Sequence, residues 1–257
     1  MLDPREEAAT AGRFGVALTQ VRRDHLISHL LAALSAELAD KVIFFGGTAL
    51  SRTFVPDGRL SEDIDLIATG SRHETAGEAE RLLVRGVRRE FPGLRWDPPL
   101  SAVRDTDPAV LRTPDLLTVR VQLLDATGYP PWPTCPRELE QRYSDAPPAT
   151  LTVPTVASFA GWKTTAWDHR RAARDLYDLW SLVSAGGIDV EAVRLYQKFG
   201  PTGLPPAPGI FDQAPEQQAW VRDLSAQTRL EVTAAEALEQ VSRAWSKAKA
   251  RAGRRRT

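Results

Sequence analysis

The chain has 257 residues, 42% hydrophobic and 26% charged, with 33 basic and 33 acidic side chains. This composition is that of a globular protein and excludes a fully disordered chain, and the balanced charge argues against a general nucleic-acid coat protein. A single cysteine, Cys135, excludes an internal disulfide. There is no apolar run of roughly 20 residues and no secretory leader pattern, so we expect a cytoplasmic protein with no membrane partner.

The first half of the chain mixes helical and strand patterns. Residues 13–40 carry apolar side chains at steps of three and four, which predicts a helix. Residues 42–45 form a short apolar run that stops at Gly46-Gly47, which predicts a buried strand ending in a tight turn. Further helices are predicted over 48–54 and 74–90, and further strands over 63–68, 94–96 and 116–124.

The second half has only helical patterns. Helices are predicted over 155–167, 172–184, 190–199, 216–230 and 233–250. Prolines and glycines crowd residues 200–215, which predicts a loop there. The change of character near 147–154 predicts an α/β (α+β) domain with a mixed sheet over 1–150, followed by an all-helical domain over 151–257 that ends in a basic tail.

One stretch combines two chemical features. Gly46 and Gly47 have no side chains to keep a triphosphate from the backbone, and Thr48 with the following amides would open a helix, whose N-terminus favours anions. Asp63 and Asp65 lie two apart on a predicted strand, so both carboxylates point to one face. Such a pair can bind one or two Mg²⁺ ions for phosphoryl displacement. Each feature alone is weak, but the combination is much stronger.

The spacing carries a family resemblance. Asp-x-Asp begins 16 positions after Gly47, as in polymerase-β-like nucleotidyltransferases. The motifs Gly46–Arg52 and Arg59–Leu66 resemble those of the AbiEii/MenT family of nucleotidyltransferase toxins. Supporting segments are Val21–His25 upstream and, downstream, Lys163 with Arg174–Leu179. The likeness runs from about residue 14 to residue 185.

The resemblance implies a toxin of a toxin–antitoxin or phage-defence system that moves NMP from an NTP to an RNA 3′ end, with tRNA as the expected RNA, and so blocks translation. It implies Mg²⁺ (or Mn²⁺) as the metal, the NTP as substrate, and tRNA or other RNA and a cognate antitoxin as partners. Asp63 and Asp65 would hold the metal and, with Lys163 and Asp178, form the catalytic set. Ser61 matches a serine that the antitoxin phosphorylates in some relatives. The residues expected to bind the nucleotide are Gly46, Gly47, Thr48, Arg52 and Ser61, although Arg52 would alternatively brace the loop.

One position departs from the superfamily pattern. Many of its members carry a third acidic residue on a neighbouring strand, and the matching position here is Gln122. A neutral amide is neither a general base nor a charged ligand. Either Asp125 or Asp178 substitutes for it, or the site works with two carboxylates.

The assignment of Lys163 and Asp178 to one site makes a geometric prediction. They are 15 residues apart, which on one straight helix is roughly 22 Å. We therefore expect the helix to break at residues 168–171, with Asp168 as the N-cap of a second helix. Asp175 is expected to be a structural ion-pair partner of Arg171 and Arg174.

Two further groups of side chains lie outside these motifs: the histidines and the basic C-terminal residues. The histidines show no metal-ligand spacing and are expected in surface or core roles: His25, His29, His73 and His169. Seven basic and no acidic side chains lie between Arg243 and Thr257, and this tail is either a phosphate-binding arm or a solvated helix end.

Two other functions stay open. One is a nucleotidyltransferase that acts on a small molecule or on a protein hydroxyl. The other is a non-catalytic nucleotide-binding or antitoxin-binding regulator, which the neutral Gln122 motivates. Nucleotide binding without pyrophosphate release would distinguish the regulator from either enzyme.

Overall fold

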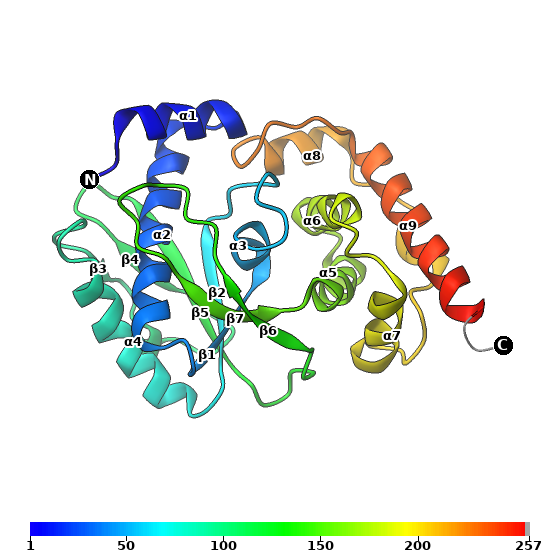
Figure 1. Cartoon of the computed structure of the whole chain (residues 1–257), viewed down its shortest axis with the longest axis horizontal. Helices are drawn as coiled ribbons and strands as arrows, with labels where there is room; N and C mark the ends of the chain where they lie inside the picture. The colour runs from blue at the N-terminus through cyan, green and yellow to red at the C-terminus, as the bar shows by residue number, and fades with distance from the viewer. Residues whose placement is uncertain (255–257) are drawn as a thin grey trace. The chain divides into compact units, whose positions relative to one another are not determined.

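The computed structural model describes residues 1–254 and divides the chain into two compact units (Figure 1). The first unit contains residues 1–129 and 135–153, and the second contains residues 130–134 and 154 onward. The chain therefore passes briefly into the second unit before it completes the sheet of the first. Each unit is described by itself below.

A seven-stranded mixed sheet organises the first unit, in the order β3-β4-β5-β2-β1-β7-β6. Its strands are β1 (Val42–Phe45), β2 (Asp63–Ala68), β3 (Arg95–Trp96), β4 (Ala109–Arg112), β5 (Thr118–Asp125), β6 (Thr134–Glu138) and β7 (Thr150–Pro154). Strand β2 pairs antiparallel with β1 and parallel with β5. This places β2 at the centre of the sheet, where its apolar side chains Ile64 and Leu66 are fully buried.

Helices complete the first unit. They are α1 (Pro4–Phe14), α2 (Leu18–Glu37), the short α3 (Gly46–Ser51) and α4 (Arg72–Gly86). Helices α2 and α4 pack against each other, and both contact β5. Helix α4 begins at an N-cap serine, Ser71, whose hydroxyl accepts from the amide of Glu74.

The second unit is helical. Its helices are α5 (Val156–Arg170), α6 (Ala173–Ser184), α7 (Val190–Phe199), α8 (Gln217–Leu224) and α9 (Ala234–Arg254), with a 3₁₀ turn at Pro208–Phe211. Its core is built on large aromatics: Trp167, Trp220 and Trp245 are all at most 1% exposed. The indole N–H groups of Trp167 and Trp220 donate to backbone carbonyls, which satisfies these polar groups inside the core.

The predicted fold class, a mixed α/β region followed by helices, is confirmed. Three strands, β4, β6 and β7, and helix α1 were missed. The strands are short, and the pattern of β6 has no buried face to reveal it. Helix α1 did carry a readable signal: Asp3 caps it, Pro4 opens it and Gly15 ends it with a left-handed backbone. Among residues 1–254, every helix is too short or too polar to span a bilayer.

Candidate active site

The two carboxylates of the Asp-x-Asp motif lie on one face of β2. Asp63 and Asp65 are half-buried, whereas Ile64 between them is completely buried. Side chains alternate along a strand, so burial of Ile64 in the core directs its two neighbours to the opposite face. The sequence prediction of a shared face for the two carboxylates is confirmed.

The turn after β1 is built against Asp65. In the β1–β2 ladder Asp65 lies opposite Phe45, the last residue before the turn. Gly46 has a φ of +79°, and a Cβ built on it would lie 2.0 Å from Oδ2 of Asp65. Only glycine accepts both this backbone conformation and this approach. The Gly46 backbone and the Asp65 carboxylate therefore form one packed unit.

The next positions bring further polar groups to the same turn. A Cβ on Gly47 would lie 2.4 Å from a guanidinium nitrogen of Arg59 and 3.2 Å from the hydroxyl oxygen of Ser61. The Thr48 hydroxyl donates to the backbone carbonyl of Asp63, which ties the start of α3 to β2. The segment between α3 and β2 thus folds back onto the glycines and places a cation and a hydroxyl beside them.

Asp63 has a partner that the sequence analysis did not identify. Arg120 on β5 lies opposite Asp63 in the parallel ladder and donates to both of its carboxylate oxygens, at 2.7 and 2.9 Å. The hydrogen bond and charge of Asp63 raise the pKa of Arg120. The register between β2 and β5 creates this pair. The one signal for it in the sequence is that Arg120 and Gln122 have the same two-residue spacing as Asp63 and Asp65.

Gln122 lies on the strand next to the two carboxylates. Gln122 lies opposite Asp65 in the β2–β5 ladder, and its amide donates to the carbonyl of Thr106 at 2.7 Å. Asp125 cannot replace it on this face. It lies three positions further along β5, an odd number, so its side chain points the other way, and it accepts from the amide of Thr127 at the strand end.

Arg52 braces the fold. Its guanidinium is fully buried and donates to the Asp24 carboxylate at 2.7 Å and to the carbonyl of Glu140 at 2.8 Å. Asp24 also accepts from the hydroxyl of Tyr143 at 2.9 Å. Of the two roles considered for Arg52, the contacts favour loop bracing over nucleotide binding, because these groups connect α2, α3 and the segment after β6.

Lys163 and Asp178 meet inside the second unit. The Lys163 ammonium lies 2.6 Å from a carboxylate oxygen of Asp178 and 3.2 Å from one of Asp175. Arg170 donates to both oxygens of Asp175, at 2.6 and 2.9 Å. Lys163, Asp175 and Asp178 are all buried, so the two cations and two carboxylates form a neutral cluster.

Two neighbouring cations keep Asp175 ionised inside this cluster. Burial by itself raises the pKa of Asp175, but the adjacent Lys163 and Arg170 outweigh it and lower that pKa to about 2. The expected ion-pair role of Asp175 is confirmed, although its partners are Lys163 and Arg170 instead of Arg171 and Arg174.

The helix breaks between Lys163 and Asp178, as the spacing predicts. Helix α5 ends at Arg170, Arg171 adopts a left-handed backbone with φ of +51°, and α6 begins at Ala173. The prediction that Asp168 caps the second helix is wrong, because Asp168 lies in the last turn of α5 and Ala172 occupies the N-cap position. The turn folds α6 back against α5, which brings the two side chains together.

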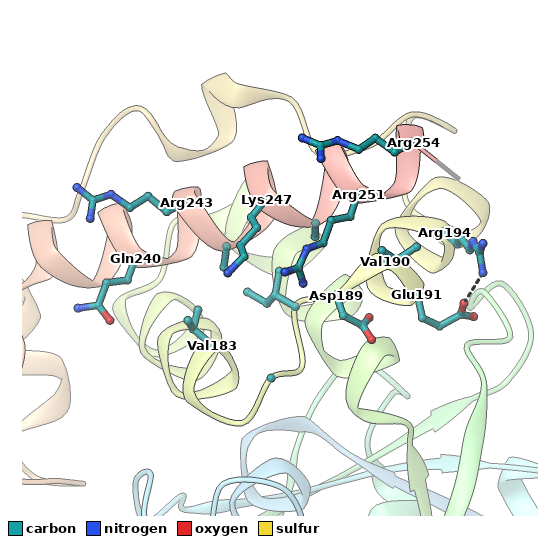
Figure 2. Close-up of a pocket in the computed structure, with 14 residues that line it drawn as sticks. Val183, Asp189, Val190, Glu191, Arg194, Gln240, Arg243, Lys247, Arg251 and Arg254 are labelled. Atoms are coloured by element: carbon teal, nitrogen blue, oxygen red, sulfur yellow. Dashed lines mark hydrogen bonds and ion pairs between the residues drawn. The ribbon is translucent and has the colours of Figure 1, made fainter. Parts of the chain in front are cut away.

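A basic cleft lies in the same unit, between α9 and the segment from the end of α6 to α7. Its volume is about 920 Å³. Figure 2 shows Lys247 and Arg251 extending from α9 toward α6 and α7. The basic lining residues are Arg194, Arg243, Lys247, Arg251 and Arg254; the acidic ones are Asp189 and Glu191. Arg255 and Arg256 of the predicted basic tail lie outside the described residues.

Comparisons with known proteins concern the family and the fold of the chain. The family described as nucleotidyl transferase AbiEii toxin, type IV toxin–antitoxin system, matches residues 29–254. No curated protein matches the sequence. The fold is similar to that of MenT4, a nucleotidyltransferase toxin from Mycobacterium tuberculosis H37Rv, with a TM-score of 0.67 and 20% identity over 95% of this chain and 89% of that one.

A second structure, an antigenic nucleotidyltransferase-like protein from Paracoccidioides brasiliensis, matches with a TM-score of 0.39 and 13% identity. The match covers 68% of this chain and 85% of that one. At this level of similarity it carries no argument.

Proposed function

The chain belongs to the AbiEii family of nucleotidyltransferase toxins of type IV toxin–antitoxin systems, and from this premise we propose that it transfers NMP from an NTP to the 3′ hydroxyl of an RNA, with tRNA as the RNA class. The bond between the α-phosphorus and the bridging oxygen breaks and pyrophosphate leaves, while the RNA 3′ oxygen loses its proton to solvent and forms the new bond to phosphorus. The observation that carries the proposal is the packing of the Asp65 carboxylate on the Gly46 turn, with Asp63 on the same strand face.

The donor set suits Mg²⁺ or Mn²⁺. Both are hard cations that prefer carboxylate oxygens, and Asp63 and Asp65 present such oxygens on one face. When bound, the metal neutralises the triphosphate and activates the attacking hydroxyl. Arg120 holds both oxygens of Asp63, so the metal competes with this guanidinium for the carboxylate.

The glycine turn would receive the phosphates. Gly46 and Gly47 leave the backbone open, and Arg59 at Gly47 adds positive charge beside it. Thr48 fixes the turn to β2 through the Asp63 carbonyl. Lys163 is the phosphate-binding cation of the second unit in this proposal, and Asp178 positions its ammonium at 2.6 Å.

The basic cleft of the second unit supports an RNA substrate. Of its basic residues, Arg194 pairs with Glu191 and Arg243 with Glu239. Lys247 and Arg251 make no ion pair with any residue in the described part of the chain. Unneutralised cations along a cleft favour a polyanion, so we assign this surface to RNA phosphates.

The cognate antitoxin is the proposed protein partner, and Ser61 is the proposed target of its control. The Ser61 hydroxyl oxygen would lie 3.2 Å from a Cβ built on Gly47, and the residue is only 6% exposed. A phosphate at this position would occupy the space in front of the glycine turn and place negative charge beside Asp63 and Asp65.

The test is incubation of the purified protein with each labelled NTP in turn, Mg²⁺ and total tRNA. We expect label in tRNA from one preferred NTP, with release of pyrophosphate. Asp63→Asn and Asp65→Asn should each lower the rate by about 100-fold or more, because loss of a group that stabilises transition-state charge has an effect of this size. Asp125→Asn is the matched control, since Asp125 lies at the far end of β5 and faces away.

Each alternative function has its own result in this assay. Label on a small molecule or on protein, with tRNA unlabelled, would indicate a different acceptor. NTP binding without pyrophosphate release would indicate a non-catalytic regulator. Near-normal turnover by both Asp63→Asn and Asp65→Asn, with unchanged melting temperatures, would remove the metal assignment.

A further inference from the structure

Three side chains of the first unit converge at a place that the proposed reaction does not use. His25 and His29 lie on α2, and Asp145 lies in the segment between β6 and β7. Both histidines are buried, at 4% and 5% exposure. One ligand atom from each of the three residues lies within 4.8 Å of the other two. His25 and His29 are buried, in line with the predicted core role, and as positions i and i+4 of α2 they also share one helix face, a spacing that the sequence analysis did not weigh as one for metal ligands.

The distances match the coordination shell of one small cation. His25 Nε2 lies 2.9 Å from Asp145 Oδ1, His29 Nε2 lies 3.2 Å from His25 Nε2, and His29 Nε2 lies 3.6 Å from Asp145 Oδ1. Zinc binds nitrogen and oxygen ligands at about 2.0–2.2 Å, so the edge of its tetrahedron is about 3.3 Å. The three measured edges bracket that value.

With protons alone, two contacts of this triangle must use one hydrogen. If the Nε2 of His25 carries a proton, it donates to Asp145 at 2.9 Å, and a bare Nε2 of His29 at 3.2 Å can only share the same proton in a three-centre hydrogen bond. If it carries none, it can accept from His29 but faces the Asp145 carboxylate as lone pair against lone pair. A cation at the centre uses both imidazole lone pairs and the carboxylate oxygen at once.

Aromatic rings pack around the two histidines. The rings of Phe91 and Tyr143 pack against His25, and Phe91 also packs against His29.

We infer that His25, His29 and Asp145 form a binding site for one divalent cation of the zinc class, distinct from the carboxylate pair on β2. Two imidazole nitrogens select Zn²⁺ or Co²⁺ over Mg²⁺, which prefers an all-oxygen shell. The fourth position is left for water. The other oxygen of Asp145, Oδ2, pairs with the Met1 amine at 2.8 Å and also lies 3.1 Å from His25 Nε2.

The site would fasten the segment after β6 to α2. Asp145 is 120 residues from His25 in the chain, and Asp24 and Tyr143 beside them already belong to the buried network around Arg52. A cation that binds the folded state only would stabilise this junction by mass action. The inference is independent of the proposed nucleotidyl transfer.

The experiment uses the full chain without an affinity tag, stripped with a chelator and titrated with ZnCl₂ or CoCl₂ alone. We expect one equivalent to bind, the melting temperature to rise, and Co²⁺ to give the visible absorption of a tetrahedral site. His29→Gln and, separately, Asp145→Asn should lower the affinity at least tenfold. The double variant His73→Gln/His169→Gln is the matched control, because both of its histidines are exposed and outside the cluster.

Absence of stoichiometric binding by the wild type overturns the inference. So does equal binding by the His29→Gln and wild-type proteins, or loss of binding only in the control. If both cluster variants fail to fold, imidazole ¹⁵N NMR of the zinc-titrated wild type decides. Shifts of exactly two Nε2 atoms support the site, and unchanged shifts overturn it. Because the readouts are binding, absorption and melting, a failure here leaves the transfer assay unaffected.

Discussion

At the scale of single residues, the candidate site depends on one close contact. Gly46 has φ of +79°, and its missing Cβ leaves the space in which the Asp65 carboxylate lies. Gly46→Ala should therefore displace Asp65, abolish transfer and lower the stability by about 1–3 kcal/mol through backbone strain. Transfer assays and thermal melts measure the two effects. Gly70→Ala is the control, because nothing lies within 4 Å of its added methyl group; an active Gly46→Ala variant would contradict the assigned role of the turn.

Arg120 is the second residue whose role is decided by one contact. It occupies both oxygens of Asp63 in a half-exposed pair. Such pairs contribute about 0.2–1 kcal/mol, so Arg120→Gln should lower the half-saturating Mg²⁺ concentration by up to about fivefold. Arg112→Gln on β4 is the control, because Arg112 pairs only loosely with Asp97, at 3.8 Å. A higher Mg²⁺ requirement in Arg120→Gln would mean that Arg120 acts on the substrate.

At the scale of elements, the junction of α5 and α6 depends on buried charge. The pKa of Asp175 is lowered from 3.8 to about 2 in the folded protein. A lowered folded-state pKa gives stability that is present above about pH 4 and is lost as the pH falls toward 2. The contribution is about 2 kcal/mol.

The comparison of wild type with Asp175→Asn isolates the contribution of the ionised Asp175 to the free energy of unfolding. The variant should be less stable at pH 7, and the difference in unfolding free energy should shrink by about 2 kcal/mol between pH 5 and pH 2. Denaturant melts across this range measure it. Asp168→Asn is the control, since Asp168 is partly exposed and its ion pair with Arg171 is long at 3.5 Å. The difference in unfolding free energy between wild type and Asp168→Asn should stay constant over this pH range. A constant difference for Asp175→Asn would contradict the assigned ion pairs.

At the scale of the whole molecule, zero net charge conceals a local excess of positive charge on α9. Removal of the basic end by truncation at 247 would also remove Ala248, which is buried, and the hydrogen bond from Lys249 to the Pro206 carbonyl. Substitution is therefore the sharper test. Lys247→Gln/Arg251→Gln/Arg254→Gln should weaken RNA binding and reduce the salt slope of log affinity by about 2, since each phosphate contact contributes about 0.7–0.9.

The control for the α9 variant removes the same amount of charge elsewhere. Arg88→Gln/Arg89→Gln/Arg222→Gln changes three exposed arginines outside the cleft. It should leave both RNA affinity and slope unchanged, and NTP binding should be unaffected in either variant. Equal slopes in the wild type and the α9 variant would assign RNA binding to another surface.

The sequence alone determined the features that local spacing encodes. The alternation around Ile64 predicted the shared face of Asp63 and Asp65, and the apolar run before Gly46 located the turn. Once the family resemblance assigned Lys163 and Asp178 to one site, the 15 residues between them predicted a broken helix. These follow from the two-residue period of a strand and the rise of a helix, which act over a few residues.

Only the tertiary structure decided which distant groups meet. The strand register paired Arg120 with Asp63, chain packing buried Arg52 against Asp24, and a contact across 120 residues joined Asp145 to His25. No local period specifies such pairs, because their partners are set by strand order and by how α2 and the segment after β6 pack. The break between α5 and α6 falls within the predicted residues 168–171, but the left-handed Arg171 marks it and Ala172 takes the N-cap position that the capping preference of aspartate had assigned to Asp168.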